Sequence, residues 1–198
     1  MALSQQYSLE RITAPATSPI TLAEAKAQMR VEHDDDDTII QRLIDVATAF
    51  VDAQGALGKA MITQTWAQWV GQVPGTVSLI IGPVQGVTAV KYYDTDGNLQ
   101  TDTLTNYEVF GTGNRTTIAP KSGFNWPVTQ VRDDAIKIEY ETGYGDATTD
   151  IPQVVRHAML MLVAHWYENR ETSGMDKLET TPFGFEELIC IERGHWYG

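Results

Sequence analysis

The chain has 198 residues, of which 26 are acidic and 14 basic, so its formal net charge is −12, and 42% of its residues are hydrophobic. This length suits one domain with a sizeable core. The negative charge argues against proteins that grip nucleic-acid phosphates or anionic membranes through Lys and Arg. The single cysteine, Cys190, excludes an intrachain disulfide, so we expect the chain to be made in a reducing compartment such as the cytosol.

The start of the chain carries no segment typical of an exported or membrane-bound protein. Its first residues, MALSQQYSLERI, lack the apolar run of roughly 7 to 15 residues found in a secretory signal. The longest apolar run, at 158–164, is far shorter than the roughly 20 residues that cross a bilayer. We therefore expect a soluble protein. Residues 7–20 are expected to form an extended lead-in to the first helix.

Two helices are predicted within residues 21–58, where they should form a helical hairpin. Thr21 and Glu24 are three residues apart and can form a capping box at the first helix. Four consecutive aspartates precede the second helix, where Asp34 or Asp35 can cap and the others oppose the positive end of the helix dipole. That second helix carries an apolar stripe formed by Ile39, Ile40, Leu43, Ile44, Ala47, Phe50 and Val51.

Residues 61–141 change to short β-branched and aromatic runs broken by Gly, Pro and Asp, which indicates a small antiparallel β region. Asp96 and Gly97 favour a tight hairpin turn, because both tolerate positive φ. A loop carrying Trp126 is expected before the last strand. The expected strands are 62–70, 77–81, 87–93, 99–104, 107–110, 116–119 and 135–140.

A long helix is expected over residues 150–172, where Asp150 and Pro152 supply a cap and a preset first turn. Apolar residues occur on both of its faces, so it should be buried on several sides, either in the core or against another subunit. Residues 173–198 should form a short last helix and an aromatic tail. The sequence thus predicts one domain of the α+β class in which the β region is an insertion.

The sequence predicts no catalytic, cofactor-binding or metal site. Residues 32–37 hold five carboxylates and could chelate Ca²⁺ or Mg²⁺, but consecutive side chains splay apart, so capping and solvation explain them better. Residues 94–98 begin like a calcium loop but lack its bidentate Glu. His165 and Glu168 lie one helical turn apart without a second such pair. Cys190 lies among glutamates, which do not activate a thiol. The sequence also lacks the P-loop, nucleophile-elbow and dinucleotide-binding motifs.

Several segments, in the same order along the chain, resemble the head–tail connector, or adaptor, proteins of tailed bacteriophages. They are ITLAEAKAQMRVEHDDDDTIIQRLIDVATAFVDAQ from Ile20, MITQTW at 61–66, TGYGD at 142–146 and DIPQVVRHAMLMLVAHWYENRE at 150–171. The match covers about residues 7–172 and corresponds to the longer form with a β insertion. From Ser173 onward the chain matches no pattern of the family.

The resemblance implies a structural virion protein that is not an enzyme and needs no cofactor. Such proteins form a dodecameric ring beneath the portal protein, line the channel through which DNA passes without specific binding, and carry the next neck or tail protein. The implied location is the head–tail neck of the virion, and the host cytoplasm during assembly, with no membrane partner. The implied fold is a helical connector core, made of the N-terminal helix pair and the long C-terminal helix, with the inserted β region.

Within that family we expect the helical faces near 39–51 and 154–166 to form core and subunit contacts, and residues 183–198 to dock on the portal. An acidic channel wall would let DNA slide past. The candidate interface residues are Ile40, Ile44, Phe50, Met159, Leu160, Val163, Trp166, Phe183, Phe185, Trp196 and Tyr197. Two alternatives remain open: another neck or tail-completion protein, and a metal-dependent hydrolase that uses the acidic run.

Overall fold

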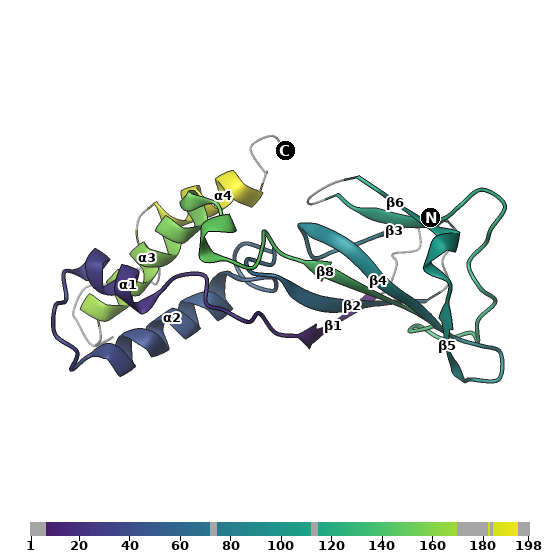
Figure 1. Ribbon diagram of the computed structural model, residues 1–198, viewed down its shortest axis with the longest axis horizontal. Helices are drawn as coiled ribbons and strands as arrows, with labels where there is room; N and C mark the ends of the chain where they lie inside the picture. Colours follow the sequence, from purple (N-terminus) through teal and green to yellow (C-terminus); the bar gives the residue numbers. More distant parts are fainter. Residues whose placement is uncertain (1–6, 72–74, 112–114, 170–181, 183, 194–198) are drawn as a thin grey trace. The chain divides into compact units, whose positions relative to one another are not determined.

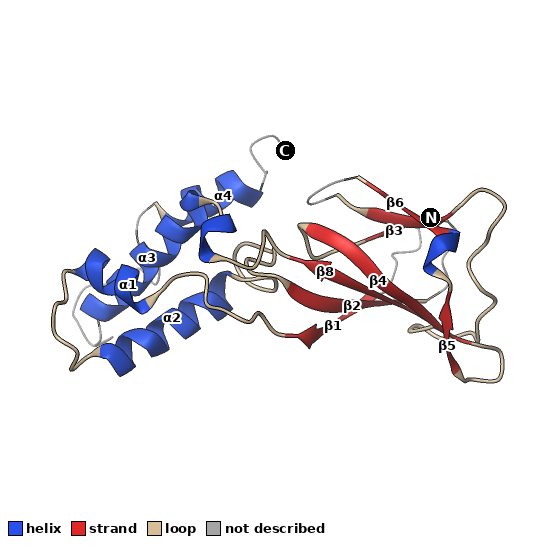
Figure 2. Cartoon of the chain, viewed as in Figure 1, coloured by secondary structure: helices blue, strands red, loops and turns tan. Residues whose placement is uncertain are grey.

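The computed structural model describes residues 7–71, 75–111, 115–169, 182 and 184–193. The chain divides into two compact units (Figures 1 and 2). The β unit contains residues 1–15 and 63–143, and the helical unit contains residues 16–62 and 144–198. Each unit is therefore built from two separate stretches of the chain.

The prediction of a helical core with a small β insertion is wrong. Over the described residues, eight strands form two antiparallel sheets, accompanied by four short α-helices. There are two physical reasons for the error. The predicted lead-in contributes a strand, Tyr7–Thr13, and the residues between 63 and 143 bury a hydrophobic core of their own.

The larger sheet has five strands, and each pairs antiparallel with its neighbours. Trp66 lies opposite Tyr140, and Val70 opposite Ile136, so these four side chains share one face of the sheet and are all buried. In spatial order the strands are β1 (Tyr7–Thr13), β2 (Gln64–Val70), β8 (Ile136–Thr142), β4 (Val84–Tyr93) and β5 (Leu99–Asp102).

The smaller sheet has the order β3 (Val77–Ser78), β7 (Thr117–Pro120) and β6 (Tyr107–Phe110). Polar side chains of the larger sheet fix the segment that follows β3. Gln68 donates from Nε2 to the Ser78 carbonyl over 2.9 Å, and its Oε1 accepts from the Ile80 amide over 3.0 Å. The Tyr140 hydroxyl accepts from the Ile81 amide over 3.3 Å. Gln68 and Tyr140 are buried, so these hydrogen bonds satisfy their polar side chains and attach the segment to the larger sheet.

Strand β1 had no signal in the hydrophobic pattern, because nearly all of its residues are exposed. It is the edge strand of the larger sheet and pairs with β2. Glu10 fastens it: the Glu10 carboxylate accepts from Trp69 Nε1 over 3.3 Å and lies 3.6 Å from Lys137 Nζ. Backbone pairing and these surface contacts, rather than an apolar face, hold β1 in the sheet.

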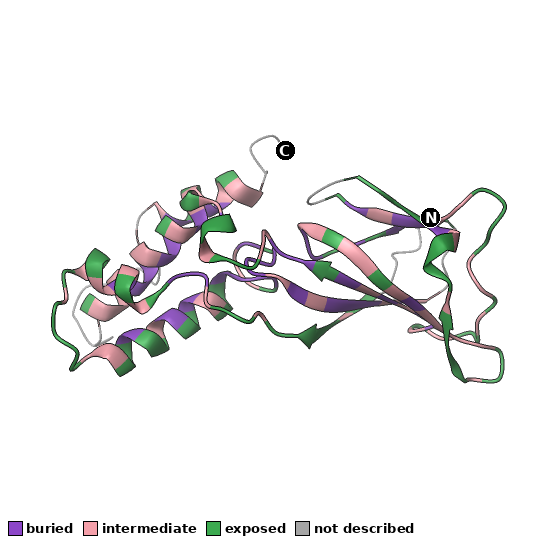
Figure 3. Cartoon of the chain, viewed as in Figure 1, coloured by how far each residue is buried: buried purple, intermediate pink, exposed green. Residues whose placement is uncertain are grey.

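The helical unit contains α1 (Leu22–Met29), α2 (Asp37–Val51), α3 (Gln153–Glu168) and α4 (Phe185–Arg193). Their buried side chains form one hydrophobic cluster. Figure 3 colours the buried residues of these helices purple. Helix α3 contacts α1, α2 and α4, and this explains why its sequence is apolar on two faces. Two short 3₁₀ helices, η1 (Leu104–Asn106) and η2 (Thr148–Asp150), complete the elements.

The helix boundaries follow local signals. The capping box is confirmed: the Thr21 hydroxyl accepts from the Glu24 amide over 3.2 Å, and the Glu24 carboxylate accepts from the Thr21 amide over 2.8 Å. The long helix begins at Gln153 and ends at Glu168, shorter than the predicted 150–172. The last residues of that predicted span, from 170, lie outside the described residues.

Candidate functional site

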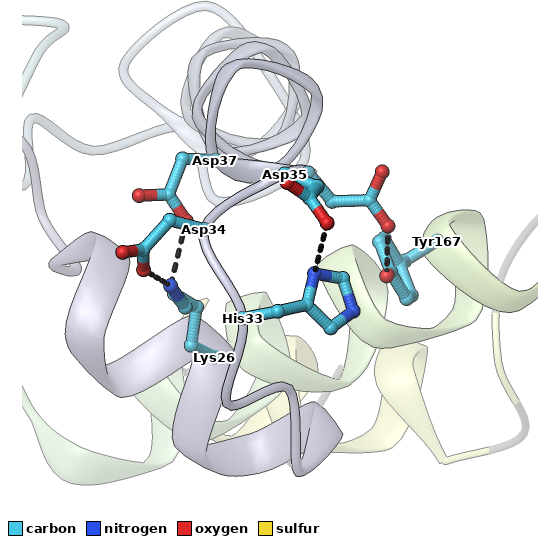
Figure 4. Close-up of polar contacts among 7 residues, drawn as sticks. Lys26, His33, Asp34, Asp35, Asp37 and Tyr167 are labelled. Atoms are coloured by element: carbon cyan, nitrogen blue, oxygen red, sulfur yellow. Dashed lines mark hydrogen bonds and ion pairs between the residues drawn. The ribbon is translucent and has the colours of Figure 1, made fainter.

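The acidic turn, residues 32–37, is the first candidate site, and the structure uses it to join helices (Figure 4). Lys26 of α1 donates from Nζ to one carboxylate oxygen of Asp34 over 2.6 Å and of Asp37 over 2.7 Å. The hydrogen bond to Asp34, followed by that to Asp37, raises the pKa of Lys26, and the same contact lowers the pKa of Asp34. One ammonium group thus offsets two of the carboxylates.

The other side chains of the acidic turn point to different partners. The Tyr167 hydroxyl of α3 donates to the Asp36 carboxylate, and His33 Nδ1 lies 3.9 Å from Asp35 Oδ2. Asp36, rather than Asp34 or Asp35, is the N-cap residue of α2. Within the part of the chain that the structure describes, no three His, Cys, Asp or Glu side chains converge to hold a metal ion. The geometry is that of a junction between three helices.

A second polar contact supports the same junction. Arg156 of α3 forms an ion pair with Glu24, the residue that completes the capping box of α1. The hydrogen bond from the Thr21 backbone is the largest influence on Glu24 and lowers the pKa of its carboxyl group. Helix α1 is thereby tied to α3 at its start and to α2 at its end.

The remaining chemical candidates have structural roles. Asp94 Oδ1 accepts from the backbone amides of Asp96 and Asn98 over 3.0 and 2.9 Å, and Gly97 has a φ of 84°, so this segment is the hairpin turn between β4 and β5. The Nδ1 atom of His165 lies 3.4 Å from the side-chain nitrogen Nδ2 of Asn169. Glu168 is exposed and Cys190 is half-buried.

The predicted interface residues occupy three kinds of environment. Phe50 is exposed at 42%, although its ring contacts those of Trp166 and Phe185 at centroid distances of 6.0 Å. Ile40, Ile44, Met159, Val163 and Phe185 are buried in the helical core, and Leu160 and Trp166 are half-buried against it. Phe183, Trp196 and Tyr197 lie outside the described residues.

Sequence reasoning missed the exposed side of α2. Ile39, Leu43, Val46 and Phe50 follow each other at spacings of four, three and four residues, and three of them are exposed. The predicted stripe places Ile39, Leu43 and Phe50 with the buried residues and does not include Val46. The spacing was visible in the sequence, but separating the two stripes required knowing where α3 packs.

The charge is distributed unevenly between the units. The helical unit has 8 basic and 17 acidic residues, hence 8 − 17 = −9, whereas the β unit has 6 basic and 9 acidic residues, hence 6 − 9 = −3. Most of the negative charge of the chain therefore belongs to the helical unit. No helix among the described residues is long and apolar enough to cross a membrane.

Comparison with known proteins gives a consistent result. Residues 19–177 match the model of a protein family described as head completion protein. No curated protein matches the chain.

Several solved structures share the fold. A chain in the neck of an empty GTA particle, computed with C6 symmetry, is 21% identical, with a TM-score of 0.76 over 94% of this chain and 95% of that one. A chain in the virion of a native gene transfer agent (GTA) particle is 22% identical, with a TM-score of 0.73 over 91% and 92%. A chain in the neck of a native GTA particle, computed with C12 symmetry, is 20% identical, with a TM-score of 0.63 over 92% and 94%.

Proposed function

The chain belongs to the head completion protein family, and from this premise we propose that it is a structural, non-enzymatic protein of the neck in a tailed-phage-like particle. The observation that carries the proposal is the family match, which includes residues of both units. The resemblance to phage connector proteins found in the sequence is confirmed at the level of the family. The shared fold with chains from GTA necks supports the same location.

The proposed form of the protein in the particle is a ring of identical copies beneath the portal protein. The matched chains occur in neck assemblies computed with C6 and C12 symmetry, which supports a rotational arrangement. A ring needs a heterologous contact that repeats until the rotation closes. In a dodecameric ring the helical unit, with its charge of −9, suits a channel wall, because an acidic wall repels DNA phosphates and lets DNA slide.

The proposed partners are the portal protein on one side and the next neck or tail protein on the other. Residues 183–198 are the proposed portal-docking segment, of which the structure describes 184–193, including α4. Among the predicted interface residues, Phe50 and Trp166 are the ones that keep exposed or half-buried aromatic surface for a neighbour. The buried ones contribute through the core that shapes this surface.

We also propose that the chain acts as one functional module in the ring. Each unit contains two separate stretches of chain, so neither unit can be removed as a continuous piece. The helical hairpin at 21–58, the β region at 61–141, the long helix and residues 173–198 would then operate together.

The test is the native mass of the purified chain, alone and mixed with the portal protein encoded beside it. The proposal predicts a closed oligomer, or a chain that joins the portal in a fixed ratio. A chain that ignores the portal and copurifies with tail-tube protein would overturn the portal-side placement and favour a tail-completion role.

A further inference from the structure

Helix α2 has a second apolar stripe beside its buried one, in which half-buried Leu43 packs against the helical core and the other three side chains are exposed. We call Ile39, Leu43, Val46 and Phe50 the outer stripe. Ile39, Val46 and Phe50 are exposed at 36%, 50% and 42%. Large apolar side chains in a continuous row on a helix surface are typical of a protein–protein interface.

Arg42 places a positive charge beside the outer stripe. Arg42 is exposed and lies one helical turn from both Ile39 and Val46. Three other cations of this acidic unit, Lys26, Lys59 and Arg156, are already engaged by carboxylates. Arg42 has no ion pair within the residues that the structure describes. The stripe is therefore an apolar surface with an available positive charge at its rim.

The outer face of α4 has the complementary character. Its buried side, with Phe185 and Ile189, packs into the helical core. Its other side presents Ile191, exposed at 46%, next to half-buried Leu188 and one turn from exposed Glu187. Glu187 forms no ion pair in the described part of the chain. This face thus presents one exposed apolar side chain, Ile191, beside Leu188 at the edge of the core, with a negative charge one helical turn away.

We propose that the outer stripe of α2 in one copy packs against the outer face of α4 in a second copy, with Arg42 opposite Glu187. The inference rests on the proposed ring and specifies its contact. The two faces belong to different helices, so the contact is heterologous, as a closed rotation requires. Apolar centres with oppositely charged rims fit the usual anatomy of an interface and set its register.

Charge reversal tests this pairing. In Arg42→Glu, the new carboxylate faces Glu187 of the neighbouring copy. In Glu187→Arg, the new guanidinium faces Arg42 of the neighbouring copy. Like charges then meet at every contact, so each variant alone should associate at least about tenfold more weakly than wild type. An equimolar mixture restores opposite charges at every contact and should recover assembly. The measurement is sedimentation velocity at neutral pH and moderate salt, from micromolar to millimolar concentration, with and without the portal protein.

The controls separate this pairing from general repulsion and from misfolding. Asp45→Arg places a charge reversal of the same size on the polar side of α2 and should leave assembly intact. Simple net-charge repulsion would make Glu187→Arg associate more strongly, because that change reduces the negative charge, whereas the pairing predicts weaker association. Unchanged circular dichroism and melting temperature show that each variant is folded.

Three results overturn the inference: both single variants assemble like wild type, the mixture fails to recover, or wild type stays monomeric at every concentration and on the portal. In each case the proposed placement beneath the portal stands if wild type still joins the portal, and that placement falls only if wild type does not.

Discussion

The Nζ atom of Lys59 lies 3.3 Å from Glu192 Oε1, and this ion pair fastens α4 to the segment that follows α2. Lys59 also donates to the main-chain carbonyl of Glu192, and the Tyr144 hydroxyl donates to the same carboxylate oxygen over 2.6 Å. A helix of nine residues is too short to be stable alone. These contacts, together with the buried Phe185 and Ile189, hold α4 in the helical unit.

The Lys59–Glu192 pair should respond asymmetrically to the removal of either partner. The side chain of Lys59 is 8% exposed and that of Glu192 is 24% exposed, so the ammonium group is the more deeply buried charge. Glu192→Leu leaves it without a carboxylate and should lower the free energy of unfolding by about 3 kcal/mol. Lys59→Met leaves the Glu192 carboxylate with its hydrogen bond from Tyr144 and partial access to water. This variant should lower the free energy of unfolding by about 1 to 2 kcal/mol.

Urea unfolding of both variants measures these changes. Glu186→Leu, at an exposed position of α4, is the matched control and should change the free energy of unfolding by less than about 0.5 kcal/mol. Equal losses for Lys59→Met and Glu192→Leu would contradict the asymmetry.

Gln68 should be essential for the stability of the β unit. Gln68→Leu keeps the size of the side chain but leaves the Ser78 carbonyl and the Ile80 amide without their hydrogen-bond partner. We expect a loss of about 1 to 3 kcal/mol in the free energy of unfolding, since each of the two lost hydrogen bonds contributes about 0.5 to 1.5 kcal/mol. The same substitution at exposed Gln41 provides the control in chemical denaturation. Similar losses at both positions would disprove the role of Gln68.

Local features could be predicted from the sequence, and long-range ones could not. The capping box of Thr21 and Glu24 depends on residues three apart, and the sequence predicted it correctly. The pairing of Trp66 with Tyr140 joins distant parts of the chain, so no local pattern encodes it. Strand β1 lacked even an apolar face, because an edge strand is held by backbone pairing. The β content was therefore underestimated.

The outer stripe of α2 also could not be predicted from a local pattern alone. Periodicity identified α2 as amphipathic but combined two stripes into one, because Ile40 and Ile39 are neighbours in sequence. Only the position of α3 shows that Ile40 is buried and Ile39 exposed. Which side of a broadly apolar helix remains available to a partner is a property of tertiary packing.

Alkaline pH should destabilise the protein partly through Tyr140. Burial raises the pKa of its phenol to about 12, whereas a tyrosine in an unfolded chain has a pKa of about 10. The folded state thus favours the neutral phenol. Its contribution is complete below pH 10 and is lost as the pH rises from about 10 to about 12, a difference of roughly 2 to 3 kcal/mol.

Tyr140→Phe isolates this effect. The variant should be less stable than wild type at pH 8, because the Ile81 amide loses its acceptor. Between pH 8 and pH 11 it should lose less stability than wild type, since it has one buried phenol fewer. Burial also raises the pKa of Tyr107 and Tyr144, so part of the decline remains. The same decline in both proteins, measured by urea unfolding at the two pH values, would rule out the role of Tyr140.

The acidic turn should be held together by Lys26, and the effect should depend on salt. Lys26→Met removes the ammonium group that contacts Asp34 and Asp37, so their carboxylates repel each other and the aspartates between them. We expect a lower melting temperature, with the largest difference from wild type at low ionic strength, because salt screens this repulsion. Thermal melts at about 20 mM and about 500 mM NaCl measure the difference.

Asp35→Asn is the matched control at the same turn. The Asp35 side chain is 96% exposed and its nearest charged partner is His33 at 3.9 Å, so neutralising it should raise the melting temperature at low salt by relieving repulsion. Mg²⁺ or Ca²⁺ should act on wild type only as NaCl of equal ionic strength does, because the carboxylates of the turn point to different partners. A divalent ion that raises the melting temperature further would show that the turn closes around a cation.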